Sequence, residues 1–231
     1  MTSPRAAVVL FPGSNREGDF VRAWRLAHGE APAVVWHDES ALPENTDLVV
    51  LPGGFSYGDY LRCGAIAART RVMGAVRAHA ERGGLVLGIC NGFQILCEAG
   101  LLPGVLMRNS GQRFLCKMQH LTVETVATPF ARGYARGQVV KFAIAHGEGN
   151  YIVDPAGLAE IENSGRVAFR YCDAEGRVGG AANPNGSMND IAGVYNERFN
   201  VLGLMPHPEN LVDPLVGGVD GRPLFAAMSA G

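Results

Sequence analysis

The strongest constraint on the fold is an apolar run, residues 85–89, that passes through a Gly-x-Cys-x-Gly turn directly into a helical pattern. Glycines two positions before and after the central residue permit a sharp strand-to-helix turn, because neighbouring backbone can pass without a Cβ clash. Gly88 and Gly92 occupy these positions around Cys90. The helix N-terminus that follows favours a thiolate, so the pattern predicts a reactive thiol at Cys90. A buried cysteine in a glycine-rich turn fits the same pattern, and the motif alone does not decide between the two.

Apolar strand-like runs alternate with helical patterns through the first half of the chain. The expected strands are residues 6–11, 33–36, 47–51 and 85–88, and the expected helices are residues 17–28, residues 72–82 and a helix from residue 91. This alternation predicts an α/β fold, a flavodoxin-like open and mostly parallel sheet with helices on both faces. Shorter strand-like pieces, residues 138–144, 167–172 and 191–195, predict added antiparallel strands in the C-terminal half. We expect residues 1–231 to form a single domain.

A second group of candidate catalytic residues follows the strand-like run 201–205, where the sequence reads Pro-His-Pro-Glu. Proline restricts the residue before it to extended conformations, so we expect His207 in an extended segment. Side chains two residues apart in an extended chain point to the same side, which predicts that Glu209 orients the His207 imidazole. Cys90, His207 and Glu209 would then supply the nucleophile, base and orienting acid of acyl transfer. The alternative, a surface turn histidine, leaves both prolines and the acid without a common explanation.

A third segment can stabilise the negative charge that forms on the carbonyl oxygen of a substrate when the nucleophile attacks. The apolar run 47–51 breaks into Pro-Gly-Gly, and glycines at the carboxyl end of a parallel strand let backbone N–H groups face a crevice. An N–H of Gly53 or Gly54 can pair with the N–H of Asn91, the residue after the nucleophile, to form an oxyanion hole. A Pro-Gly-Gly turn is common, so this prediction depends on the presence of Cys90 and His207.

These three segments resemble the class I, triad-type glutamine amidotransferases. The Cys-x-Gly-x-Gln run from Cys90 and the Pro-His-Pro-Glu run around His207 are typical of that superfamily. Further runs resemble one family within it, the glutaminase subunits of phosphoribosylformylglycinamidine synthase. They are residues 11–15, 53–62, 108–109, 113–114, 145–149, 183–187 and 203–209. The resemblance therefore extends over nearly the whole chain.

The resemblance implies a function. Cys90 attacks the side-chain amide of glutamine to form a thioester and release ammonia, His207 carries the proton, and Glu209 orients His207. By the same resemblance, Gln94, Asn109 and His146 contact the substrate. The ammonia is expected to pass to a separate synthetase large subunit, which uses ATP and Mg to convert formylglycinamide ribonucleotide in de novo purine biosynthesis. A small bridging subunit is a further candidate partner.

The chain departs from the family pattern at two positions next to these motifs. Many relatives carry a cysteine after the asparagine that corresponds to Asn15 and an arginine after the glutamate that corresponds to Glu209. Here the residues are Arg16 and Asn210. Neither is a triad member, so we expect the chemistry to be preserved and a partner contact or loop conformation to differ.

Composition excludes several classes of protein. The net charge of −2 provides no basic field for nucleic acid, and no Gly-x-x-x-x-Gly-Lys-Ser/Thr loop or paired-metal carboxylate cluster is present, so no cofactor and no metal are expected on this chain. Five cysteines without Cys-x-x-Cys spacing argue against a disulfide framework. The first residues lack the apolar region of a signal peptide, and no apolar run is long enough to span a membrane. We therefore expect a cytoplasmic protein.

Two other functions are compatible with parts of the sequence. A cysteine peptidase or chaperone-like hydrolase with the same turn would explain Cys90, but not the pairing of His207 with Glu209 or the presence of Gln94. A catalytically idle subunit that only binds and regulates a synthetase is the other alternative, and an intact triad argues against it.

Overall fold

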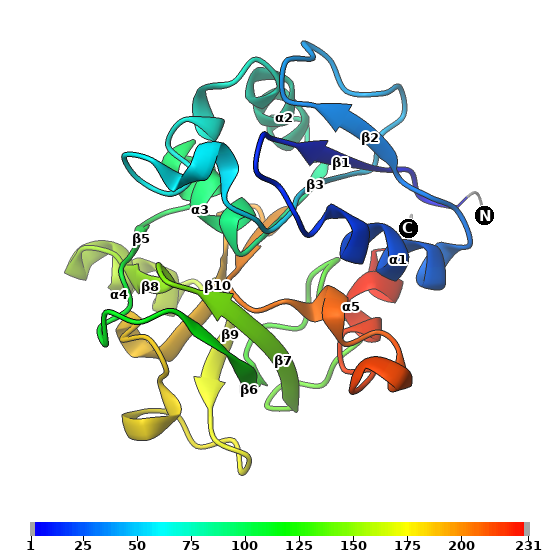
Figure 1. The fold of residues 1–231 in the computed structure, drawn as a ribbon. Helices are drawn as coiled ribbons and strands as arrows, with labels where there is room; N and C mark the ends of the chain where they lie inside the picture. Colours follow the sequence, from blue (N-terminus) through cyan, green and yellow to red (C-terminus); the bar gives the residue numbers. More distant parts are fainter. Residues whose placement is uncertain (1–2, 229–231) are drawn as a thin grey trace.

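One sheet takes strands from both halves of the chain in the computed structural model, which describes residues 3–228 (Figure 1). Its strands are β1 (Ala6–Leu10), β2 (Ala33–Trp36), β3 (Leu48–Leu51), β4 (Leu85–Ile89), β6 (Leu115–Val123), β7 (Val139–His146), β9 (Val167–Cys172), β10 (Ile191–Tyr195) and β11 (Val201–Leu204). Their order across the sheet is β2-β1-β3-β4-β11-β10-β9-β6-β7. The pairs from β2 to β11 are parallel and those from β11 to β7 antiparallel, which confirms the predicted mixed α/β sheet.

Helices cover the parallel part of the sheet on both faces. They are α1 (Glu17–His28), α2 (Val72–Glu81), α3 (Asn91–Glu98) and α5 (Arg222–Ala227), whereas α4 (Pro155–Asn163) precedes β9 in the antiparallel half. Helix α1 buries Phe20 and Trp24 on one face and ends at Gly29, whose left-handed φ of 81° suits glycine. Phe20 packs against Phe225 of α5, with the ring centroids 6.1 Å apart. Figure 1 shows α1 and α5 side by side on one face, with α2 and α3 on the other.

The C-terminal half holds more regular structure than the sequence analysis predicted. Strand β6 begins at Leu115, and a separate two-stranded sheet pairs β5 (Val105–Met107) with β8 (Asn150–Ile152). Helix α4 was not predicted, although the sequence carries its start signal. The carboxylate of Asp154 accepts hydrogen bonds from the N–H groups of Ala156 and Gly157, and Pro155 occupies the first turn.

The three segments singled out in the sequence leave the sheet from three neighbouring parallel strands. Leu51 of β3 lies opposite Gly88 of β4, and Ile89 lies opposite Leu204 of β11. The carboxyl ends of β3, β4 and β11 therefore meet at one edge of the sheet, where open α/β folds bind their ligands. The topology thus brings the Pro-Gly-Gly turn, Cys90 and the His207 segment together.

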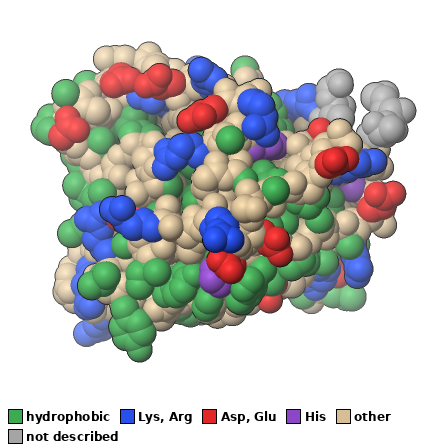
Figure 2. Space-filling model, turned by 90° about the horizontal axis from the view of Figure 1, so that it is seen from above, with side chains coloured by type: hydrophobic (Ala, Val, Ile, Leu, Met, Phe, Trp, Pro, Cys, Tyr) green, Lys and Arg blue, Asp and Glu red, His purple; other side chains and the backbone are tan. Residues whose placement is uncertain are grey.

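The surface has no region of a single charge on the face shown in Figure 2, where acidic, basic and apolar side chains are interspersed. None of the helices within residues 3–228 is long and apolar enough to cross a membrane.

Candidate active site

Cys90 sits in a strained turn between β4 and α3, as the sequence predicts. Its backbone has φ 52° and ψ −106°, which is unusual for a residue with a side chain, and its N–H donates to the carbonyl of Leu204 at 2.8 Å. A Cβ on Gly92 would collide with the carbonyl oxygen of Leu51, and one on Gly88 would lie 2.6 Å from the carbonyl oxygen of Gly92. Both glycines are therefore required by close backbone packing. Cys90 directly precedes the first residue of α3, so the thiol lies at a helix N-terminus.

His207 and Glu209 form a buried pair. The imidazole Nδ1 lies 2.6 Å from Glu209 Oε1, and both side chains are at most 3% exposed. The backbone N–H of His207 donates to Ala143 at 2.8 Å, which fixes the segment against β7. The predicted pairing is present, and His207 itself forms an antiparallel bridge with Ala143, but the extended chain predicted as far as Glu209 is wrong. Pro208 begins a short 3-10 turn, Pro208–Asn210, because its fixed φ suits the first position of a turn, and this turn brings Glu209 back toward His207.

The surroundings of His207 favour its protonated form. Burial by itself lowers the pKa of His207, but the negative charges of Glu209 and Cys90 and hydrogen bonds to both outweigh burial and raise the pKa to about 10. The imidazolium therefore has a carboxylate on one side and the Cys90 sulfur on the other. This arrangement can hold the proton that a thiol gives up before it attacks.

A cavity of about 220 Å³ joins the thiol and the imidazole. Cys90 and His207 both line it, with Gly54 from the loop after β3. The other lining residues are Asn15, Arg16, Phe55, Phe114, Cys116 and Ala145. Sequence reasoning assigned no cavity role to these six, although four of them, Asn15, Phe55, Phe114 and Ala145, belong to the runs that carry the family resemblance. The sulfur of Cys90 also lies 3.7 Å from the carbonyl oxygen of Ala145.

The candidate oxyanion donors lie on either side of Cys90. Gly54 lines the cavity, and its N–H donates to no other residue within 3–228. Asn91 is the first residue of α3, a position where the N–H has no partner within the helix. Gly53 has a different place, since a Cβ on it would lie 2.9 Å from Cε1 of His207. The N–H of Gly53 likewise donates to no residue within 3–228, so both predicted glycines remain candidate donors, and Gly53 in addition leaves room for the base.

Gln94, Asn109 and His146 lie close to the cavity but do not line it. The amide of Gln94 donates to the carbonyl of Glu148 at 2.6 Å and accepts from the amide of Asn91 at 2.8 Å. Asn109 donates to the carbonyl of His146 at 2.9 Å and accepts from the N–H of Gly149 at 3.0 Å. All three side chains are buried. In this structure their polar groups hold the segment after β7 in place.

His146 is a second histidine beside His207. Its Nδ1 lies 3.1 Å from Asn109 Oδ1, and its Nε2 is buried without a partner in the described part of the chain. Burial and the positive charge of His207 lower the pKa of His146 to about 4. At neutral pH this ring is therefore uncharged and does not compete with His207 for a proton.

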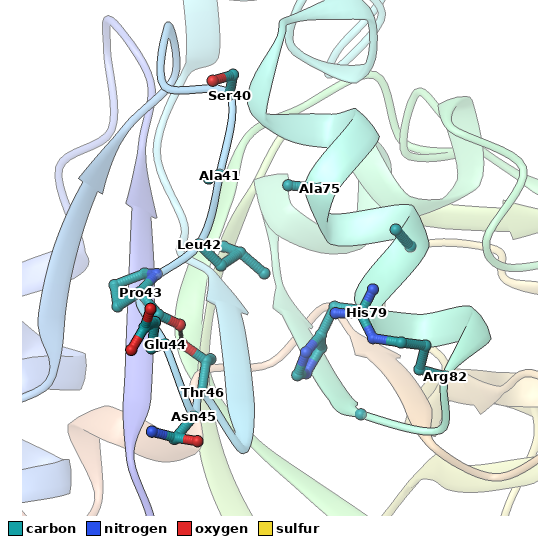
Figure 3. Close-up of a pocket in the computed structure, with 12 residues that line it drawn as sticks. Ser40, Ala41, Leu42, Pro43, Glu44, Asn45, Thr46, Ala75, His79 and Arg82 are labelled. Atoms are coloured by element: carbon teal, nitrogen blue, oxygen red, sulfur yellow. Dashed lines mark hydrogen bonds between the residues drawn. The ribbon is translucent and has the colours of Figure 1, made fainter.

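A wider cavity of about 640 Å³ lies away from this site. The loop of residues 40–46 and helix α2 line it, with Leu42 and His79 extending toward one another in Figure 3. It lies near the residues that precede β3 and β4, at the amino ends of these strands, whereas Cys90 follows the carboxyl end of β4. Among residues 3–228, no group of three or more His, Cys, Asp or Glu is arranged to hold a metal ion.

Comparison with known proteins assigns the family. The model of the CobB/CobQ-like glutamine amidotransferase domain matches residues 3–218. The chain belongs to this family of glutamine amidotransferases. The PurQ subunit of phosphoribosylformylglycinamidine synthase from Nitrobacter winogradskyi is 62% identical to it over 98% of this chain and 97% of the relative. The PurQ subunit from Rhodospirillum rubrum is 57% identical over 96% of this chain and 97% of the relative.

Solved structures of amidotransferases share the fold. A chain in the structure of PurLQS from Thermotoga maritima is similar, with a TM-score of 0.87, 43% identity and 98% coverage of both chains. The glutaminase domain of CTPS from Trypanosoma brucei matches with a TM-score of 0.61 at 15% identity, over 97% of this chain and 92% of that one. At this identity the second likeness concerns the fold alone.

The two departures from the amidotransferase pattern lie next to the triad. Arg16 lines the cavity, packs against Gly53, and pairs with Asp19 at 3.1 Å. Asn210 closes the turn that carries Glu209, and its N–H points to the carbonyl of His207 at 3.4 Å. Arg16 therefore brings a cation to the cavity wall.

Proposed function

We propose that this chain is the glutaminase subunit of phosphoribosylformylglycinamidine synthase. It hydrolyses glutamine to glutamate and ammonia, and it passes the ammonia to a synthetase subunit in de novo purine biosynthesis. The observation that carries the proposal is the cavity that Cys90 and His207 share, with Glu209 2.6 Å behind the imidazole. The full-length similarity to PurQ subunits supports the choice of pathway. A cysteine peptidase is disfavoured because the relatives are amidotransferases over the whole chain.

The first half-reaction uses the proton held at His207. The sulfur of Cys90 attacks the side-chain amide carbon of glutamine, and the carbonyl oxygen becomes an oxyanion. The N–H of Asn91, together with that of Gly53 or Gly54, stabilises this charge. The imidazolium of His207 then donates its proton to the leaving nitrogen, so that ammonia departs and a thioester to Cys90 remains.

The second half-reaction reverses these roles. Neutral His207 takes a proton from water, the resulting hydroxide attacks the thioester carbon, and the same N–H groups hold the new oxyanion. The tetrahedral intermediate then collapses, the carbon–sulfur bond breaks, and glutamate leaves, so that the Cys90 thiolate and the protonated His207 are restored. Glu209 keeps the proton of Nδ1 in place throughout, so the opposite nitrogen always faces the sulfur.

The remaining steps belong to a partner. Hydrolysis of an amide through a thioester consumes neither ATP nor Mg²⁺, so we assign both, with the ribonucleotide, to the synthetase partner and no cofactor to this chain. The similar chain from Thermotoga maritima comes from a structure of PurLQS, which supports an assembly with further subunits.

The five cysteines are all unpaired, which supports a reducing cytoplasm as the location. The sheet that joins both halves of the chain supports a single amidotransferase domain.

The test is the rate of glutamate release from glutamine by the purified chain, measured alone and with its synthetase partner, ATP and ribonucleotide. We expect release in the complex and loss of it in Cys90→Ala. Cys116→Ser is the matched control, because this thiol lines the same cavity but belongs to β6, and it should retain most activity. Activity in Cys90→Ala would refute the mechanism, and release that the synthetase does not stimulate would refute the pathway.

A further inference from the structure

The loop that follows β3 presents large apolar side chains on the outside of the molecule. Tyr60 is 74% exposed and Leu61 is 92% exposed. Phe55, in the same loop, is also exposed and lines the catalytic cavity, and so does Phe114 from the other side of the chain. The opening of the cavity therefore has an apolar border that continues into residues 55–61, which we call the rim loop. Exposed apolar side chains grouped in this way are typical of protein interaction sites.

The backbone of the rim loop is strained. Tyr57, Asp59 and Leu61 have φ values of 55°, 55° and 70°. Residues with a Cβ adopt this region at an energetic cost, so such a conformation persists only where surrounding contacts hold it. At the base of the loop, the N–H of Tyr57 donates to the carbonyl of Pro12 at 2.6 Å, and the Tyr57 hydroxyl lies 2.8 Å from His37 Nδ1. The side chain at the tip, that of Leu61, is almost fully exposed and adds little to hold the loop.

The side chain of Asn91 connects the rim loop to the turn that carries the nucleophile. Its amide accepts from the N–H of Ser56 at 3.1 Å and donates to Asp59 Oδ1 at 3.2 Å. These are the first and last residues of a 3-10 turn, Ser56–Asp59. Asn91 is buried and follows Cys90 directly, and its backbone N–H is a candidate oxyanion donor. A displacement of the rim loop therefore acts on the position of that donor.

The product of the reaction identifies the protein that covers this surface. Ammonia that escapes into water at neutral pH is protonated and loses the lone pair with which it attacks. The subunit that consumes ammonia therefore has to cover the opening of the cavity, where Phe55 and Phe114 lie. The similar chain from Thermotoga maritima comes from a structure of PurLQS, which supports such an assembly. The exposed aromatic and aliphatic side chains of the rim loop suit the apolar centre of a protein interface.

We propose that the rim loop is a contact surface for the synthetase subunit and that Asp59 is a positioning residue that couples this contact to the oxyanion hole through Asn91. When the synthetase buries Tyr60 and Leu61, the loop is held in the conformation in which Asp59 and Ser56 fix the Asn91 side chain. In the free subunit the loop leaves this conformation for part of the time, and hydrolysis of glutamine is slower. The inference rests on the proposed glutaminase function and adds to it the means by which the partner controls the site.

The first test removes the contact between Asp59 and Asn91. Glycine and asparagine both tolerate a positive φ, so Asp59→Gly keeps the backbone but loses the acceptor, whereas Asp59→Asn keeps an acceptor oxygen and is the matched control. With saturating synthetase, ATP and ribonucleotide, we expect kcat for glutamate release to fall about 10- to 100-fold in Asp59→Gly, which is less than the loss of a whole oxyanion donor causes, and less than about threefold in Asp59→Asn. The KM for glutamine should change less than about threefold in both variants.

The second test removes the apolar contact at the tip of the loop. In the double variant Tyr60→Ser with Leu61→Asn, we expect the dissociation constant of the synthetase, measured by isothermal titration calorimetry, to rise at least about 10-fold, because large apolar side chains dominate the binding energy of interfaces. At saturating synthetase its kcat should stay within about twofold of wild type. Val178→Asn is the matched control, since Val178 is an exposed apolar residue that does not line the catalytic cavity, and it should leave the dissociation constant unchanged.

Each outcome bears on one claim. An unchanged dissociation constant in the double variant places the synthetase contact elsewhere and overturns the inference. It is also overturned if the synthetase stimulates Asp59→Gly as much as wild type, or if Asp59→Gly changes only KM, since the acid then acts on the substrate. Binding of the synthetase to Asp59→Gly with wild-type affinity shows that this variant is folded, and thermal melts of all variants check the same point. If the wild-type complex releases no glutamate at all, the proposed function fails instead.

Discussion

Gly53 lies directly against the imidazole of His207. A Cβ on Gly53 would stand 2.9 Å from Cε1 of His207 and 3.2 Å from Cγ of Arg16. The first distance is shorter than real Cβ atoms adopt, and His207 is itself anchored by Ala143 and Glu209. The absence of a side chain at Gly53 is therefore a condition for the position of the base.

Gly53→Ala should displace the imidazole without unfolding the protein. A shift of about 1 Å in a catalytic group can lower the rate about 100-fold, so we expect kcat for glutamine hydrolysis to fall by roughly 10- to 100-fold. Gly74→Ala is the matched control, because its Cβ meets nothing within 4 Å and it lies in α2, where alanine is favoured. Steady-state kinetics and thermal melts of both variants give the comparison. Unchanged kcat in Gly53→Ala would show that His207 can move freely.

Glu209→Gln tests the role of the orienting acid. The glutamine keeps the shape of the side chain but removes the charge that helps to raise the pKa of His207. In the serine protease triad the equivalent change lowers kcat by about 10⁴-fold, and we expect a loss of at least 100-fold here. The KM for glutamine should stay within about threefold, because Glu209 lies behind the imidazole and does not line the cavity. A rise in KM with little change in kcat would contradict this role.

His146 should make the protein sensitive to acid. Its pKa falls from 6.5 to about 4 in the fold, so the unfolded chain binds more protons between these values and stability declines as pH falls from 6.5 to 4. The loss amounts to as much as about 3 kcal/mol by pH 4. His146→Gln, which can still reach Asn109, should flatten this dependence in urea unfolding at pH 7, 5.5 and 4.5. His120→Gln on β6 is the control, and an unchanged slope in His146→Gln would contradict the assignment.

The sequence predicted the parts of the site that local backbone determines. The turn at Cys90 follows from Gly88 and Gly92, which are forced by contacts within a few residues or with the adjacent strand. The alternation of strands and helices likewise predicted the parallel sheet and, with it, the meeting of Cys90 and His207 at one edge. The roles of Cys90, His207 and Glu209 in catalysis remain predictions until they are measured.

The hydrogen-bond partners of buried polar side chains could not be predicted from the sequence. Gln94 was expected to contact substrate, but its amide is occupied by Asn91 and by the carbonyl of Glu148, a residue 54 positions away. The nearness of Asp59 and Glu148 to the Cys63 thiol was missed for the same reason. Such contacts depend on the register of distant strands, and no local pattern encodes it.

Asn185, in the Asn-Pro-Asn-Gly-Ser run, should be a strong determinant of stability. Its side chain is fully buried and donates to the carbonyl of Gly149 at 2.7 Å and to the hydroxyl of Tyr171 at 3.2 Å. Asn185→Ala removes these two bonds, together with the two that Asn185 Oδ1 accepts from the N–H and hydroxyl of Ser187, and leaves a small void, so we expect the free energy of unfolding to fall by about 2–3 kcal/mol.

The same substitution should also affect glutamine binding, because Gly149 belongs to the segment after β7 that Gln94 and Asn109 hold beside the cavity. In the folded fraction, we expect the KM for glutamine to rise more than kcat falls, as the segment that carries Glu148 loosens. Asn163→Ala, at an exposed position near the end of α4, should alter stability by less than about 0.5 kcal/mol. Urea unfolding and glutamine kinetics measure the two effects. A destabilised Asn185→Ala with an unchanged KM would mean that Asn185 serves the fold and that Asn109 and Ser187 are sufficient to hold Gly149.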